Sequence, residues 1–390
     1  MINILPSSQP VAVRRGFTIM EMIVVIVLLL ALLALVLPAF VSIKRSSEFS
    51  VSQELVKQAV RDARGRALSS NSDSAVVFSY NPENGLQLIA CTRLGSIIDG
   101  NLNNPNDPAN PAVTRDVFAP VTGRKPVTLP VGVSVRGYAP AFKVDAHWYE
   151  PINNGGNRYA TDEPAWVFPE TDFYSRLVTT AASPQDVGSD RQTFMVRFQA
   201  RTGQLVASEP TAAVVVFPRP SASGRGAGTI AGVERLDLST DVAAQVSAII
   251  DRPEWAGVAS AAKPFGQRDL LGDDSSDTVL TRSVGRVALY RERDLAQALG
   301  ARLDPVSQTI YELPVNYKAA LAGNRSNRTV YPQYLPELRN EARTPLMVSR
   351  WVEGFGNLTD ASSNVRSTGA RPIIYSVHPL RGELVEEVAQ

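Results

Sequence analysis

The chain has 390 residues, enough for a sizeable core and for two domains. It carries 39 basic and 38 acidic residues, a net charge of +1, so there is no electrostatic basis for a nucleic-acid partner. Its lone cysteine, Cys91, excludes an internal disulfide, and its position in an apolar strand segment is typical of a small buried hydrophobe. The chain has two histidines, His147 and His378, which argues against a multi-histidine metal site and leaves few candidates for a neutral-pH general base.

The first strong pattern is an uncharged apolar segment over residues 22 to 43. A helix of about 20 apolar residues crosses a bilayer, and Arg14 and Arg15 before it indicate a cytoplasmic N-terminus with the rest exported. A cleaved secretory signal is a competing interpretation, but residues 37 to 41 lack the small-residue site that it needs. A plain uncleaved anchor is another, and it accounts for everything except Gly16 and Glu21.

Glu21 is the one acidic residue at the edge of this apolar segment. A carboxylate there is costly, which makes it a functional candidate by default. It ends the string Arg14-Arg15-Gly16-Phe17-Thr18-Ile19-Met20-Glu21. This string resembles the leader of type IV prepilins and type II secretion pseudopilins.

The resemblance implies a processing event and an assembly residue. A prepilin peptidase would cut between Gly16 and Phe17 and methylate the new N-terminus at Phe17, leaving 390 − 16 = 374 residues. Glu21 would then pair with the N-terminal amine of a neighbouring subunit and set the register of a filament, since a buried carboxylate needs a partner. The alternative is that Glu21 only reaches back to the aqueous interface. Pro38 stands where pilin-like helices commonly carry a helix-loosening proline.

The helical pattern continues beyond the apolar segment. Apolar residues recur at three- and four-residue steps from Val51 to Leu68, with charged residues between them. We therefore expect one helix from about Thr18 to Ser69, which forms a 17–70 stem with an amphipathic second half. The string Leu55-x3-Ala59-x3-Ala63-Arg64-x2-Ala67 near its end, followed by the apolar strand segment Ala75-Val76-Val77-Phe78, resembles H-type minor pseudopilins.

A β-rich region follows. The sequence predicts a hairpin with strands 75–80 and 86–92 around an Asn-Pro-Glu-Asn-Gly turn. It predicts a second hairpin with strands 193–199 and 204–208. Further strands are expected at 113–118, 127–135, 165–168, 212–217 and 373–377.

The chain changes character after a Pro-, Ser- and Gly-rich joint at residues 218 to 228. Beyond it the sequence predicts a helix over 236–250, an apolar patch over 279–292 and a short helix over 293–303. The expected fold class is α+β and pilin-like: a long hydrophobic N-terminal helix packed on an antiparallel β-sheet head, with a large mixed C-terminal extension. The expected parts are a leader (1–16), the stem (17–70), a head (71–220) and the extension (221–390).

The sequence carries none of the common catalytic signatures. It contains no G-x-S-x-G, HExxH, CxxC or P-loop string, so we expect no enzyme. An acidic loop with Asp273, Asp274 and Asp277 has hard oxygen ligands for calcium, but it lacks a full EF-hand pattern, and a solvated turn is favoured. No other cofactor is expected.

The function implied by the resemblance is that of a bacterial minor pilin or pseudopilin. It would be a single-pass inner-membrane protein with its head in the periplasm, assembled into a type II secretion pseudopilus or type IV pilus-like filament. Its partners would be the prepilin peptidase, the inner membrane and other pilin subunits. The alternative hypothesis is a membrane-anchored periplasmic binding protein or enzyme, with its active region in residues 221–390.

Overall fold

The structure is a computed structural model of the 390-residue chain. It describes residues 19–81, 85–99, 113–139, 165–167, 169, 192–207, 211–218, 247, 250, 276–298, 343–359, 365–367 and 371–388. The chain divides into two compact units, residues 1–48 and 49–390.

The longest element is helix α1, Ile19–Ser69, which has 51 residues. Its first 30 residues belong to the first unit, and the part from Phe49 onward belongs to the second. Alanine and long unbranched side chains favour helix in this second part. The helix ends at a serine-rich turn, where the amide of Ser70 donates to the carbonyl of Arg66 over 2.8 Å.

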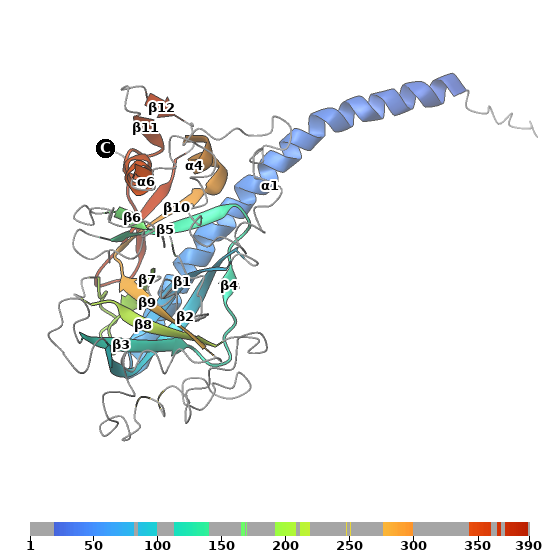
Figure 1. Ribbon diagram of the computed structural model, residues 1–390. Helices are drawn as coiled ribbons and strands as arrows, with labels where there is room; N and C mark the ends of the chain where they lie inside the picture. Colours follow the sequence, from blue (N-terminus) through green and yellow to red (C-terminus); the bar gives the residue numbers. More distant parts are fainter. Residues whose placement is uncertain are drawn as a thin grey trace, which may run out of the picture. The chain divides into compact units, whose positions relative to one another are not determined.

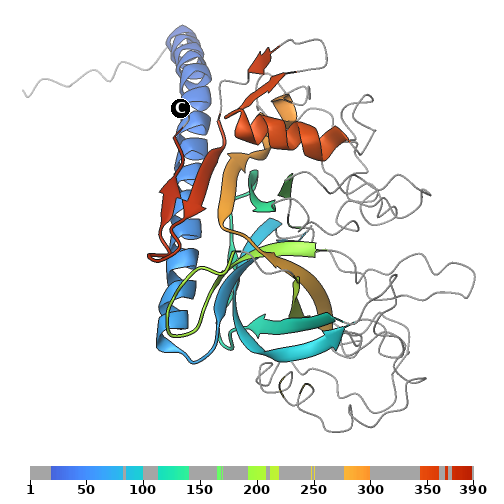
Figure 2. The same cartoon turned by 90° about the vertical axis from the view of Figure 1, so that its left-hand side faces the viewer.

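A closed β-barrel forms the body of the second unit (Figures 1 and 2). Its strands hydrogen-bond in the order β1-β7-β9-β8-β3-β2, and β2 pairs back with β1 to close a ring of six. The short strand β4, Val127–Thr128, is attached to β2 outside the ring. The bounds of the ring strands are β1 Ser74–Asn81, β2 Gly85–Asp99, β3 Val113–Pro120, β7 Gln192–Phe198, β8 Ala213–Pro218 and β9 Ser276–Ser283.

The barrel corrects the predicted pilin-like fold class. The largest sheet is a closed ring, not an open antiparallel sheet, and two of its pairs, β3–β8 and β7–β9, are parallel. The expected separate C-terminal extension is also wrong as a description of the fold. Strand β9 lies between β7 and β8, so a segment from beyond residue 220 completes the barrel.

A second sheet of five strands has the order β14-β13-β10-β5-β6. Strands β5 (Val133–Ala139) and β6 (Ala165–Val167) precede the barrel strand β7 in the sequence, whereas β10 (Arg286–Arg291), β13 (Ile373–Val377) and β14 (Leu384–Glu386) follow β9. Helices α4 (Glu292–Ala298) and α6 (Arg343–Glu353) pack beside it, and β11 (Asn357–Thr359) pairs with β12 (Val365–Ser367).

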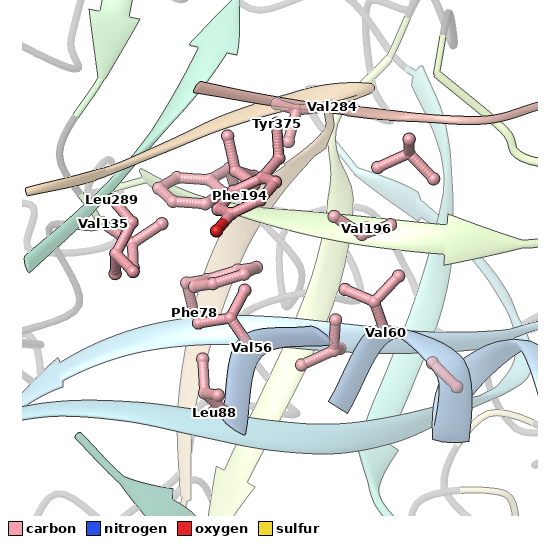
Figure 3. Close-up of a cluster of buried hydrophobic side chains, with 14 of the residues drawn as sticks. Val56, Val60, Phe78, Leu88, Val135, Phe194, Val196, Val284, Leu289 and Tyr375 are labelled. Carbon is pink, nitrogen blue, oxygen red and sulfur yellow. The ribbon is translucent and has the colours of Figure 1, made fainter. Parts of the chain in front are cut away.

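Side chains alternate between the two faces of each barrel strand, so the strands contribute to two separate hydrophobic cores. Ala75, Val77 and Met195 belong to a cluster inside the barrel, while Val76 and Val196, one residue away, face outward. The outward cluster joins α1, the barrel and the second sheet (Figure 3). Its labelled members are Val56, Val60, Phe78, Leu88, Val135, Phe194, Val196, Val284, Leu289 and Tyr375.

Most expected strands lie where the apolar patterns placed them. The predicted 127–135 strand is divided into β4 and β5 around a turn at Gly132, whose φ of 83° suits glycine. The predicted 204–208 strand is reduced to a single bridge between Phe198 and Leu205. The predicted helix over 236–250 lies outside the described residues, apart from positions 247 and 250.

Candidate assembly interface

The first unit presents an exposed apolar helix. From Ile19 to Leu33 every described side chain of α1 is exposed, and all but Glu21 are uncharged. A helix that is apolar on all sides requires a covering surface, because exposed apolar area of this extent marks an interaction site. Its large exposed side chains are Ile19, Met20, Met22, Ile23, Val24, Val25, Ile26, Val27, Leu28, Leu29, Leu30, Leu32, Leu33, Val36, Phe40 and Ile43.

Within the described residues, no helix provides a stretch long and apolar enough to cross a membrane. This corrects the predicted single-pass localisation in the bacterial inner membrane.

The structure describes some, but not all, of the residues predicted to act in processing and assembly. Gly16 and Phe17 lie outside the described residues. Glu21 lies in the first turn of α1, where the helix dipole favours a carboxylate. Pro38 lies within the helix, where a proline leaves one backbone carbonyl without its usual partner.

The calcium candidates are not brought together in the described part of the chain. Asp273 and Asp274 lie outside it, and the backbone of Asp277 pairs with Phe217 in the β8–β9 ladder. Among described residues there is no group of three or more His, Cys, Asp or Glu side chains that could hold a metal ion.

The second part of α1 is bound to the barrel by a buried stripe. Val56, Val60, Ala63 and Ala67 recur at steps of four, three and four residues and are at most 1% exposed. This spacing places them on one helix face, which packs against β1, β7 and the second sheet (Figure 3). The side chains of the stripe are small, so α1 packs closely against the strands along this face.

Polar contacts fasten the same part of α1 at both ends. At one end, Lys57 lies over the ring of Tyr375 at 5.7 Å. At the other, the Arg64 guanidinium donates to the carbonyls of Gly203 (3.3 Å) and Leu380 (2.9 Å). The amide of Arg201 donates to the carbonyl of Ala67 over 2.7 Å, which satisfies a carbonyl of the last helical turn.

A charged cluster lies at the start of β1 and links four segments of the barrel. Arg197 of β7, which is 4% exposed, donates to Asp73 at 2.5 Å and to Asp116 at 2.7 Å. Arg93 also contacts Asp116 at 2.8 Å, and the Ser96 hydroxyl donates to Asp116 at 2.9 Å.

The surroundings of Asp116 lower its pKa. Burial alone would raise this pKa, but the bonds from Arg93, Ser96 and Arg197 outweigh burial. The carboxylate stays ionised and suits a structural role, not proton transfer.

A second polar group lies between the five-stranded sheet and its helices. Arg136 of β5 donates through Nε to the Tyr290 hydroxyl (2.9 Å) and through Nη1 to the carbonyl of Trp166 (3.2 Å). Ser134 donates to Glu292 at 2.5 Å. Burial raises the pKa of Glu292, against the opposing effects of the Ser134 hydrogen bond and the Arg136 charge.

Sequence reasoning missed both polar groups. Their members come from segments up to 158 residues apart, and none of them stands in a recognisable motif. The sequence offered one local signal: four charged residues stand within expected strand segments or their extensions. They are Arg93, Asp116, Arg136 and Arg197. A charged residue on a buried strand face needs a partner.

No protein-family model, curated protein or solved structure matches this chain.

Proposed function

We propose that this protein is a structural subunit of a type IV pilus-like or type II secretion filament, and that it joins neighbouring subunits through the apolar first part of α1. The proposal rests on a change in the burial of apolar side chains along one helix. Residues 19 to 33 expose their apolar side chains, whereas the stripe from Val56 to Ala67 buries its own in the second unit. One part of α1 therefore holds the head, and the other is available to helices of other subunits.

The leader string supports the same role. Gly16 followed by Phe17 and then by Glu21 resembles the prepilin processing segment, so the mature chain would begin at methylated Phe17 and contain 374 residues (390 − 16). Glu21 would pair with the N-terminal amine of a neighbour's Phe17, because a carboxylate enclosed among apolar helices needs a positive partner. The bulk of the second unit favours a low-copy minor subunit over a repeating shaft subunit.

The primary test is the intact mass and N-terminal sequence of the protein isolated from its native cells. The expected result is a chain that begins at N-methylated Phe17. An unprocessed Met1, or a start at an unrelated position, would remove the prepilin assignment. A Gly16→Leu variant should remain unprocessed, since a larger side chain at the cleaved position blocks the peptidase.

A second test addresses assembly. Glu21→Ala should be processed normally but should enter filaments poorly, as measured by immunoblotting of sheared filament fractions. The matched control is Glu48→Ala, which removes an acidic residue of α1 that contacts Lys44 at 3.7 Å. Equal incorporation of both variants would contradict the assembly role of Glu21.

A further inference from the structure

Three segments distant in sequence meet at the C-terminal end of α1 and form a surface of arginines and leucines. We call this surface the arginine–leucine pad. It comprises Arg61, Arg64 and Leu68 of α1, Arg201 of the turn after β7, and Leu380 and Arg381 of the turn between β13 and β14.

Arg64 holds the two turns against the helix. Its guanidinium donates to a carbonyl in each turn, Gly203 at 3.3 Å and Leu380 at 2.9 Å. Two glycines allow this approach. A Cβ at Gly382 would stand 2.2 Å from Cδ of Arg64, and one at Gly203 would stand 2.9 Å from Leu68. Both glycines have positive φ, so the turns suit glycine in backbone conformation as well as in space.

The arginines of the pad have no carboxylate partner in the described part of the chain. Arg64 bonds only carbonyl oxygens, and Arg201 donates to the amide oxygen of Asn71 at 3.0 Å. Among described residues, no ion pair involves Arg61 or Arg381, although nearby Asp62 is paired with Arg124 at 3.0 Å. Glu383 is the acidic residue of the second turn, so four arginines outnumber it and the pad is positively charged.

Two large apolar side chains lie among these charges. Leu68 is 44% exposed and Leu380 is 66% exposed. Arginine with neighbouring apolar surface is typical of protein-binding surfaces, because its planar guanidinium can bond carboxylates in pairs. A nucleic-acid backbone would match the charge but not the leucines, and the chain as a whole has a net charge of only +1.

We propose that the arginine–leucine pad binds an acidic segment of a partner protein, one in which Asp or Glu residues flank an apolar side chain. The carboxylates would take the unpaired guanidinium donors of Arg201 and Arg381, and the apolar side chain would cover Leu68 and Leu380. This proposal does not rest on the filament role, because the pad belongs to the second unit and uses none of residues 19–48.

The test uses the full chain in a nonionic detergent that covers the exposed part of α1. The probe is a short fluorescent peptide of alternating glutamate and leucine, and its binding is followed by anisotropy. Wild type should bind the peptide, and the affinity should fall as salt rises because the contact is electrostatic. The double variant Arg201→Glu/Arg381→Glu should bind at least about tenfold more weakly, which corresponds to about 1.4 kcal/mol.

A matched double variant controls for net charge. Arg350→Glu/Arg371→Glu changes two exposed arginines outside the pad and should bind as wild type does. Leu380→Ser should weaken binding of the glutamate–leucine peptide, and an all-glutamate peptide should bind wild type less tightly.

Three outcomes would overturn the proposal. They are no binding by wild type at low salt, equal losses in the two double variants, and tighter binding of a single-stranded oligonucleotide of the same charge. None of them depends on the N-terminal mass, so the pad and the filament assignment can fail separately.

Discussion

Gly137 of β5 lies directly against the ring of Phe194 in β7, and a methyl group on its Cα would stand 2.6 Å from Cγ of that ring. The contact joins the five-stranded sheet to the barrel through Phe194, a member of the cluster in Figure 3. Phe194 also stacks against Phe78, with ring centroids 4.7 Å apart. The absence of a side chain at residue 137 therefore sets how closely the two sheets approach.

Gly137→Ala should destabilise the protein by about 1 to 3 kcal/mol, because overpacking forces a well-packed ring to shift. The measurement is the free energy of unfolding from denaturant titration. Gly65→Ala is the matched control, since nothing lies within 4 Å of its added Cβ. It should stabilise by about 0.5 to 1 kcal/mol, because alanine loses less backbone entropy in a helix than glycine. Equal effects of the two substitutions would show that Gly137 does not control the sheet contact.

Arg197→Met should be among the most destabilising substitutions of the charged cluster. It leaves Asp73 and Asp116 facing each other without the cation between them, and losing one partner of a buried pair costs about 3 to 5 kcal/mol. The side chains of Asp73 and Asp116 are 15% and 21% exposed, which places the expected loss near the lower end, about 3 kcal/mol. Thermal and denaturant unfolding of the same preparation measure it.

The control for that substitution is Arg124→Met. Arg124 and Asp62 form a pair at 3.0 Å whose side chains are 53% and 45% exposed. Exposed pairs contribute about 0 to 1 kcal/mol, so this variant should unfold almost as wild type does. A loss for Arg197→Met no larger than the loss for Arg124→Met would refute the structural role of the cluster.

Acid stability should depend on Asp116. Its bonds from Arg93, Ser96 and Arg197 outweigh burial and lower its pKa in the folded protein. The carboxylate therefore stabilises the fold above its unfolded pKa of about 3.9, and this contribution is lost as pH falls through the lower folded pKa. Asp116→Asn should be less stable than wild type at pH 7, and the difference should shrink below about pH 4. Denaturation midpoints across that range test this, and a constant difference down to pH 2 would contradict it.

Cys91 should resist thiol reagents in the folded protein. Its side chain lies inside the barrel with an exposure of 0%, and burial raises the pKa of the thiol, so little reactive thiolate forms. Ellman's reagent should release no colour from native protein at pH 8 and one equivalent per chain after denaturation. Prompt labelling of the native protein would show that the barrel opens at this position.

The amino-acid pattern by itself was sufficient to predict most local elements. The three- and four-residue apolar spacing predicted α1 to Ser69, because a helix needs that spacing to bury one face. The turn at residues 81–85 and the alternating residues beside it predicted β1 and β2. Helix α6 was not predicted, since its residues lie in a Pro-, Asn- and Arg-rich region where no local pattern dominates.

Only the tertiary structure decided how these elements pair. Whether a sheet is open or closed depends on which strands hydrogen-bond, and β9 pairs with β7 and β8 across more than 50 residues of intervening chain. Long-range packing likewise brings Asp73, Asp116 and Arg197 together, and it places the turns that carry Arg201 and Arg381 against Arg64. Local side-chain periodicity specifies which face of an element is buried, whereas the partner of that face is chosen by the packing of the whole chain.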